Sequence, residues 1–341
     1  MAGEQELGAE YQTIFDPHTC TRRGLCPVTQ IRHQGEPFES HSLYFELHGS
    51  GPDKVVFIMG LNSTSFAWLP QVDHFGKQPH YSVLVFDNRG VGMSGSPRGP
   101  YTTSGMAEDV IALLDYIGWM ADRDLHVVGI SLGGMIAQGQ GPVHFIHATD
   151  QTTELAYRIP GRISSLSLVV TTPGGRPWSN LPSWKGVSSL TRLLTMTDLD
   201  LKLPIIMGML FPAGWLDQKA DNDPLGRTNR EIQSEIYRRR LEIARPQTLL
   251  GSVSQMWAGI THHVTPERLR KISSSIPKVL ILTGDEDHLV DPAGSVYLKT
   301  HMPEAEYQRW EKTGHGISGQ WTMRFNDILQ KTFRESKVAT K

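Results

Sequence analysis

The amino-acid sequence predicts an α/β fold, a mostly parallel sheet with helices on both faces. The first observation is a repeated unit in which a short β-branched run, a glycine-rich or polar turn and a longer helical pattern follow one another. The second is that several strand-like runs are almost wholly apolar, as expected of strands buried on both faces. A chain of 341 residues also suits one large domain with an insertion better than two equal domains.

Seven segments are predicted as strands, and one helix between them is especially clear. In residues 105–119, Met106, Val110, Leu113 and Ile117 recur near helical spacing and give an apolar stripe toward the core. The predicted strands are residues 42–48, 54–59, 82–86, 126–130, 165–171, 278–283 and 306–310.

The strand pattern stops between residues 173 and 271, where helical stretches are interrupted by prolines. Because strands resume only at residue 278, an all-helical cap is predicted to be inserted into the sheet domain. The predicted domains are an N-terminal extension (1–30), an α/β core (31–172 and 273–341) and a helical cap (173–272).

A short segment interrupts the helix expected after residue 131. Beyond Gln138 the chain meets two glycines and Pro142, which cannot continue a helix. Joining Gln138 to Glu154 restores one amphipathic helix. Residues 139–153 are therefore predicted to be an insertion foreign to the fold, either a surface loop or an artefact of gene prediction.

The charge of the chain argues against several classes of partner. The 33 basic and 35 acidic residues leave a formal net charge of −2, so no basic field is expected to attract nucleic acid or anionic lipid. No apolar run approaches 18 residues, which argues against stable membrane insertion. Residues 1–15 lack the basic start and apolar stretch of a secretory signal. The expectation is a cytoplasmic protein with a small-molecule, apolar substrate.

The two cysteines, Cys20 and Cys26, both lie in the N-terminal segment. Two free thiols in a reducing compartment are expected, and a disulfide or half of a metal site is the alternative. No cofactor and no metal are expected.

The strongest local signal is a G-x-S-x-G pattern at Gly129, Ser131 and Gly133, where an apolar strand gives way to a helix. On such a strained turn the serine hydroxyl is lifted clear of the sheet, and small neighbours avoid clashes. The following helix adds backbone N–H groups aimed at developing negative charge. Ser131 is therefore predicted to be a nucleophile.

A nucleophilic serine needs a base and a group that orients the base. Among the 14 histidines, His315 stands out because it follows the last predicted strand and is flanked by two glycines. The acid is sought among four carboxylates that follow the strand at 278–283. Asp287 is preferred, with Asp285 next, because a carboxylate three residues past the strand-ending glycine lies in the loop beside the nucleophile turn. The other carboxylates of this loop suit turns that bond to their own backbone.

Five stretches, residues 55–61, 86–95, 129–133, 284–287 and 314–315, occur in the order found in the α/β-hydrolase superfamily. The sequence resembles that family over about residues 40–335, and the order Ser, Asp, His is the order this fold uses. The sequence at residues 88–90 and 101–103 is most similar to that of the capped, esterase-like members. The resemblance implies an oxyanion hole made by the backbone N–H groups of Leu61 and Leu132.

The sequence departs from the family at Met59, where many relatives carry histidine. Because that histidine is usually a supporting residue, the change is expected to affect the packing of the loop more than the catalytic chemistry.

Relatives that open epoxides or remove halide have aspartate as nucleophile, so Ser131 argues against both activities. Arg89 is predicted to pin its loop through backbone contacts. Arginines 238–240 are predicted to be a solvated helix face, with anion binding as the alternative.

The predicted activity is hydrolysis of a small or medium apolar carboxylic ester or thioester through an acyl-enzyme. Apolar residues of the cap suggest an acyl or alkyl group as the recognised part, although such residues are usually core. There are two alternatives: an amide or C–C bond hydrolase with the same triad, or a catalytically idle ligand receptor. Contact of residues 204–216 with a membrane surface also stays open. The cap residues in question are Trp178, Trp184, Met196, Met207, Met209, Leu210, Phe211, Trp215 and Met256.

Overall fold

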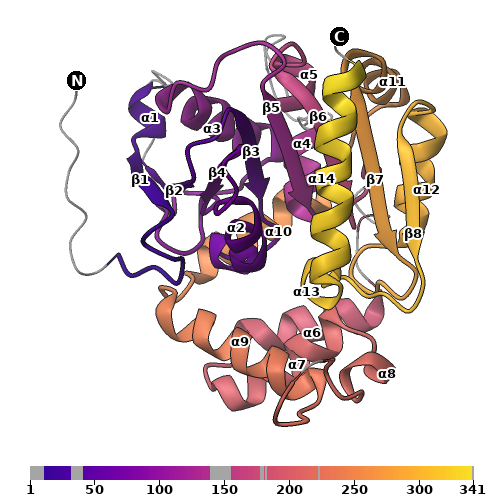
Figure 1. The fold of residues 1–341 in the computed structure, drawn as a ribbon. Helices are drawn as coiled ribbons and strands as arrows, with labels where there is room; N and C mark the ends of the chain where they lie inside the picture. Colours follow the sequence, from indigo (N-terminus) through magenta and orange to yellow (C-terminus); the bar gives the residue numbers. More distant parts are fainter. Residues whose placement is uncertain are drawn as a thin grey trace.

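A computed structural model describes residues 11–31, 41–138, 155–176, 180, 183–221 and 223–339. Within these residues, eight strands form one sheet in the order β1-β2-β4-β3-β5-β6-β7-β8 (Figure 1). The pairs β1-β2 and β2-β4 are antiparallel, and every pair from β4 to β8 is parallel. The strands are β1 (Cys20–Cys26), β2 (Leu43–His48), β3 (Asp53–Ile58), β4 (Tyr81–Phe86), β5 (Leu125–Ile130), β6 (Ile163–Val169), β7 (Lys278–Gly284) and β8 (Glu306–Trp310).

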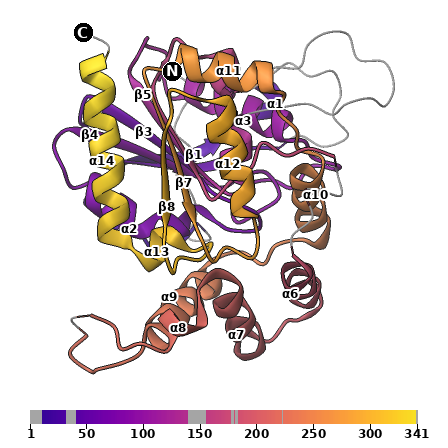
Figure 2. The same cartoon turned by 90° about the vertical axis from the view of Figure 1, so that its right-hand side faces the viewer.

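Helices cover both faces of this sheet (Figure 2). One face carries the short helix η1 (Ser65–Trp68), α2 (Leu69–Phe75), α13 (Ile317–Gln320) and α14 (Thr322–Ala339). The opposite face carries α1 (Val28–Ile31), α3 (Thr103–Tyr116), α4 (Leu132–Gln138), α5 (Leu155–Arg158), α11 (Pro266–Ser275) and α12 (Pro292–His301).

The two faces hold separate hydrophobic clusters. Along β3, Val56 and Ile58 belong to one cluster, and Val55 and Phe57 belong to the other. Successive side chains of a strand point to opposite faces, so a strand covered on both sides must be apolar throughout. The predicted fold class, a mostly parallel sheet with helices on both faces, is confirmed.

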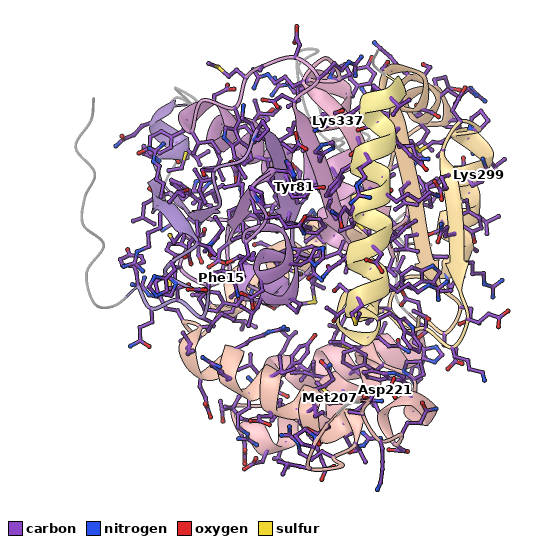
Figure 3. The ribbon with its side chains drawn as sticks, in the orientation of Figure 1. Phe15, Tyr81, Met207, Asp221, Lys299 and Lys337 are labelled. Atoms are coloured by element: carbon purple, nitrogen blue, oxygen red, sulfur yellow. The ribbon has the colours of Figure 1, made fainter. Side chains whose placement is uncertain are left out.

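Between β6 and β7 the described residues form helices and two isolated bridges, with no strand among them. Four of these helices gather beyond one end of the sheet, and α10 lies closer to the sheet (Figure 2). Met207, Phe211 and Leu216 form a small core within this helical layer, where Figure 3 labels Met207. Besides α11, the helices between β6 and β7 are α6 (Trp184–Thr195), α7 (Leu199–Leu210), α8 (Ala213–Leu216), α9 (Asn229–Ile243) and α10 (Leu249–Ile260).

Two features near the ends of elements bear on the sequence predictions. Strand β1 pairs with β2, whereas the sequence analysis assigned no strand to residues 1–30. The predicted insertion at 139–153 lies outside the described residues; α4 ends at Gln138, α5 begins at Leu155, and these two helices contact each other.

None of the described helices combines the length and apolar character that crossing a membrane requires.

A buried histidine in the sheet makes stability depend on pH. Burial lowers the pKa of the His126 imidazole to about 3, and its ring stacks on Phe333 at a centroid distance of 4.5 Å. Below a pH of about 6.5 the unfolded chain binds a proton at this histidine, while the folded chain does not until the pH approaches 3. The free energy of unfolding should therefore fall by about 1.4 kcal/mol per pH unit below pH ~6.5 on account of this group.

His126→Gln should make this pH dependence shallower by that amount, because an amide can still hydrogen bond Ser165, which lies 2.8 Å from Nδ1, but does not titrate. Urea unfolding between pH 4 and 7.5 measures the slope. The exposed His80→Gln is the control, and its slope should match that of the unmodified protein. An unchanged slope in His126→Gln would contradict the prediction.

Candidate active site

Ser131 occupies the turn between β5 and α4. Its φ of 56° lies in the left-handed region, which a residue with a side chain adopts only under local strain. The backbone is held there by two hydrogen bonds: the N–H of Ser131 donates to the carbonyl of Val169 at 2.9 Å, and the hydroxyl of Thr171 donates to the carbonyl of Ser131 at 2.8 Å. This is the strained strand-to-helix turn that the G-x-S-x-G pattern predicts.

The two glycines of the pattern are required by close backbone contacts. A Cβ on Gly129 would lie 2.4 Å from the carbonyl oxygen of Gly133, and a Cβ on Gly133 would lie 2.1 Å from the carbonyl oxygen of Ile58. Backbone atoms cannot move aside as a flexible side chain can. The turn therefore presses directly against the end of β3.

Gly133→Ala is expected to lower the free energy of unfolding by about 3 kcal/mol or more, because overpacking against a rigid backbone costs that order of energy. Gly208→Ala, inside α7, is the matched control. A Cβ on Gly208 meets nothing within 4 Å, so alanine there should stabilise the helix by about 0.5–1 kcal/mol. Urea unfolding of both variants measures the difference, and equal effects would refute the steric explanation.

Asp287 and His315 meet beside the carboxyl ends of β7 and β8. Nδ1 of His315 lies 2.7 Å from Oδ2 of Asp287, and both side chains are buried. The other carboxylate oxygen of Asp287 accepts the backbone N–H groups of Leu289 and Val290 at 2.8 and 3.0 Å. The carboxylate is thereby fixed, and it holds one ring nitrogen of His315.

Two competing carboxylates of the same loop accept backbone N–H groups. Oδ1 of Asp285 accepts the N–H of Thr313 at 3.1 Å, and Oδ1 of Asp291 accepts the N–H of Ala293 at 2.8 Å as the N-cap of α12. The geometry therefore favours Asp287 over Asp285, as the sequence analysis did.

Ser131 reaches the same edge of the sheet from β5. Its neighbours in the order β5-β6-β7-β8 are parallel, so the residues that follow β5, β7 and β8 emerge at one edge. Within the described residues, no hydrogen bond joins the hydroxyl of Ser131 to the imidazole of His315. Catalytic hydrogen bonds are often long without substrate and tighten when it binds.

Backbone donors flank the serine. A Cβ on Gly60 would lie 3.0 Å from Cβ of Ser131 and 3.6 Å from its Oγ, so the chain that carries Leu61 passes directly beside the nucleophile candidate. Leu132 is the first residue of α4, where an N–H group has no acceptor in its own helix. In the described part of the chain, the N–H of Leu61 has no hydrogen-bond acceptor either. Both amides are thus free to donate to an oxyanion.

A polar cluster from α10, not found from the sequence, supports this loop. Asn62 has a φ of 53°, and its N–H donates to Oε1 of the buried Gln255 at 2.9 Å. Nε2 of Gln255 in turn donates to the carbonyl of Arg89 at 2.8 Å, and the Asn62 side chain donates to Oγ of Ser252 at 2.7 Å. Residues almost 200 positions apart in the chain position the turn after Leu61, and no local pattern reveals such a contact.

Side-chain hydrogen bonds and an ion pair hold the loop after β4 in place. Nδ2 of Asn88 donates to the carbonyl of Met59 at 2.9 Å. The Arg89 guanidinium donates to the carbonyl of Gly105 and forms an ion pair with Asp109, so Arg89 pins its loop as predicted but uses a carboxylate as well as a backbone group. Burial raises the pKa of the Asp109 carboxyl, yet Arg89 and His41 overcome this and hold it below its usual value.

The helical layer contacts the loop that carries His315. The N–H of Gly316 donates to the carbonyl of Leu210 at 2.8 Å, at the end of α7. A Cβ on Gly314 would lie 2.5 Å from that carbonyl oxygen, and a Cβ on Gly316 would lie 2.5 Å from the Phe211 ring. The two glycines that flank His315 therefore permit a close approach of α7.

The apolar residues expected to line a pocket have different positions. Met207 and Phe211 are buried in the core of the helical layer, whereas the Trp184 side chain is 84% exposed. Trp178 lies outside the described residues. The partly exposed members of the set are Met196, Met209, Leu210, Trp215 and Met256.

The arginine run at 238–240 is not uniformly solvated. Arg238 forms an ion pair with Asp200. Burial lowers the pKa of Arg240, whose guanidinium lies 5.1 Å from the Tyr237 ring centroid and whose Nε has no hydrogen-bond partner among the described residues. Arg240 is therefore only partly exposed, whereas Arg239 is exposed, because a helix packed on a neighbour turns some of its residues inward.

Comparisons with known proteins identify the family of the chain and agree with its fold. Residues 47–327 match the profile of a family described as Alpha/beta hydrolase family. The chain is 31% identical over 289 residues to the proposed carbamate hydrolase RutD of Azorhizobium caulinodans, covering 84% of this chain and 93% of that protein. It is 25% identical over 297 residues to the corresponding protein of Caulobacter segnis, covering 84% and 94%. Among solved structures, the enol-lactonase from Burkholderia xenovorans LB400 has the same fold, with a TM-score of 0.64 and 21% identity over 86% of this chain and 97% of that chain.

Proposed function

The chain belongs to the α/β hydrolase family and is a hydrolase, and from this premise we propose that Ser131, His315 and Asp287 form its catalytic triad. The observation that carries the proposal is the 2.7 Å hydrogen bond between Asp287 and Nδ1 of His315, at the sheet edge where Ser131 occupies a strained turn. A carboxylate on Nδ1 fixes the tautomer in which Nε2 can accept a proton from serine.

The proposed reaction proceeds through an acyl-enzyme. Oγ of Ser131 attacks the substrate carbonyl carbon while Nε2 of His315 takes the hydroxyl proton, and the N–H groups of Leu61 and Leu132 stabilise the oxyanion. His315 then gives the proton to the leaving alkoxide or thiolate. Water repeats the sequence on the acyl-enzyme and releases the acid.

The proposed substrate is a small or medium apolar carboxylic ester or thioester. Support comes from the apolar side chain of Leu61, which is partly exposed and packs against the core cluster beside the turn. We also propose that residues 173–272 act as a cap domain, since the end of α7 contacts both glycines beside His315. A cap in that position excludes water and encloses an acyl group.

Hydrolysis of a carbamate with the same triad is a second candidate. It is favoured by the relatives proposed to be carbamate hydrolases, which the chain matches over 84% of its length. A carbamate carbonyl needs the same nucleophile, base and oxyanion donors as an ester carbonyl.

Matched p-nitrophenyl substrates test the proposal. We expect a p-nitrophenol burst of one equivalent with esters of acetic to octanoic acid, an acyl adduct on Ser131 by mass spectrometry, and a maximum of kcat/KM at an intermediate chain length. A p-nitrophenyl N-methylcarbamate that turns over faster than the best ester would favour the second candidate. If neither substrate class nor a p-nitroanilide reacts, and a fluorophosphonate probe leaves the protein unlabelled, the triad proposal fails and a ligand receptor takes its place.

A further inference from the structure

A second cluster of reactive side chains lies at the far edge of the sheet, on β1 and β2, four strands from β5. Cys20 is the register partner of His48, and Glu46 lies two residues before His48 on the same face of β2. The Cys20 sulfur, a Glu46 carboxylate oxygen and a His48 ring nitrogen all lie within 4.8 Å of one another. The aromatic ring of Phe15, labelled in Figure 3, packs against His48 at a centroid distance of 5.0 Å.

The hydrogen bonds around His48 favour one of its two neutral tautomers. The hydroxyl of Thr19 donates its single proton to the carbonyl of Asp16 at 2.9 Å, and its oxygen lies 2.9 Å from Nδ1 of His48. This arrangement favours the tautomer in which Nδ1 carries the proton and donates it to that oxygen. In this tautomer Nε2 of His48 has a lone pair and no proton, and the atom has no hydrogen-bond partner among the described residues.

Glu46 presents a second acceptor without a partner. Its Oε1 accepts the hydroxyls of Thr13 at 2.7 Å and Tyr44 at 2.8 Å. Its Oε2 is buried, has no hydrogen-bond partner in the described residues, and faces Nε2 of His48 at 3.6 Å. Both side chains are 0% exposed, so water does not solvate the two acceptors.

Two buried acceptors that face each other need a positive charge between them. A shared proton would draw the nitrogen and oxygen to about 2.7–2.9 Å. Two ligand atoms at about 2.0–2.1 Å from a tetrahedral Zn²⁺ lie roughly 3.3 Å apart, and a thiolate sulfur lies only slightly farther from either of them. The observed 3.6 Å, with a sulfur inside 4.8 Å, suits a metal ion better than a proton.

We propose that Sγ of Cys20, Oε2 of Glu46 and Nε2 of His48 bind a Zn²⁺ ion. Thiolate and carboxylate together neutralise the two positive charges, so the complex can be buried at low electrostatic cost. Binding releases the thiol proton to solvent. Thr19 on Nδ1 and the hydroxyls of Thr13 and Tyr44 on the carboxylate act as the outer hydrogen-bond partners that orient metal ligands.

The expected role of the ion is to hold the edge of the sheet together, with a water molecule as its fourth ligand because three protein ligands leave one tetrahedral position open. Cys20 begins the edge strand β1, while Glu46 and His48 belong to the next strand. The Zn²⁺ would fasten β1, and the preceding residues that contact Glu46 and His48, to the sheet. This site is separate from the proposed triad, so its test does not depend on the proposed function.

The test uses the full-length, tag-free protein stripped of metal with a chelator. We expect one equivalent of Zn²⁺ by elemental analysis after dialysis and a rise in Tm with added Zn²⁺. Co²⁺ in place of Zn²⁺ should give a thiolate-to-metal charge-transfer absorption. Cys20→Ser should lose this absorption and bind Zn²⁺ at least 100-fold more weakly, since loss of an outer partner alone costs about 10–100-fold.

Cys26→Ser is the matched control, because Cys26 is the other free thiol, at the opposite end of β1. It should keep the cobalt absorption and the zinc-dependent rise in Tm. His48→Gln should lose both, and circular dichroism checks that each variant is folded. A folded, metal-free protein that takes up no Zn²⁺, or a Cys20→Ser variant that binds Zn²⁺ as tightly as Cys26→Ser, would overturn the proposal.

Discussion

Replacing Ser131 with alanine is expected to abolish labelling by a fluorophosphonate probe and to lower kcat for p-nitrophenyl esters by up to roughly a million-fold. The hydroxyl is the atom that forms the acyl bond, and in the proposed site no other group can replace it. The fold should persist, because the backbone bonds of Ser131 to Val169 and Thr171 involve only its N–H and carbonyl.

The exposed Ser274→Ala is the control for the labelling experiment. Ser274 lies one residue before the end of α11, and its hydroxyl donates only to the carbonyl of Lys271 among the described residues. This variant should label and turn over like the unmodified protein. Labelling that survives in Ser131→Ala would remove Ser131 from its proposed role.

Asp287→Asn is expected to lower kcat by about 10⁴-fold with little change in KM. An amide at 287 can donate to Nδ1 of His315, which stabilises the tautomer in which Nε2 carries the proton and cannot act as a base. Asparagine can still accept the N–H groups of Leu289 and Val290, so the loop should keep its shape.

Asp285→Asn separates this effect from general damage to the loop. Oδ1 of an asparagine at 285 can still accept the N–H of Thr313, and the side chain has no bond to His315 in the described structure. Its kcat should therefore stay within a few-fold of the unmodified value. Equal losses in the two variants would contradict the assignment of Asp287 as the orienting group.

Seven strands, including the edge strand β8, could be read from the sequence, but the edge strand β1 could not. All seven predicted strands match β2 to β8 to within two residues at either end. Burial on both faces makes the inner strands largely apolar, and this signal is local. Strand β1 has the sequence CTRRGLC and lies at the sheet edge, where one side of the backbone has no neighbouring strand. Polar residues suit an edge, so its pattern resembles that of a loop.

Some features of the candidate site could likewise be predicted from the sequence, and others could not. The serine turn is set by the backbone contacts of Gly129 and Gly133, whose missing side chains are visible in the sequence. The sequence preferred Asp287 among several carboxylates, but the hydrogen bond to His315 that supports this preference is present only in the folded chain. The same is true of Gln255, which supports the turn at Asn62.

The sequence by itself determined the sheet class, the strained serine turn and the histidine loop. Burial on a sheet requires apolar residues at regular positions, and backbone crowding requires glycine, so both are visible among neighbouring residues. Only the tertiary structure decided which carboxylate holds His315, which helix supports the turn after Leu61, and that Cys20 lies beside Glu46 and His48. These are contacts between side chains that are far apart in the chain and that the strand order brings close together. Distance and direction in space, which a linear pattern does not contain, determine them.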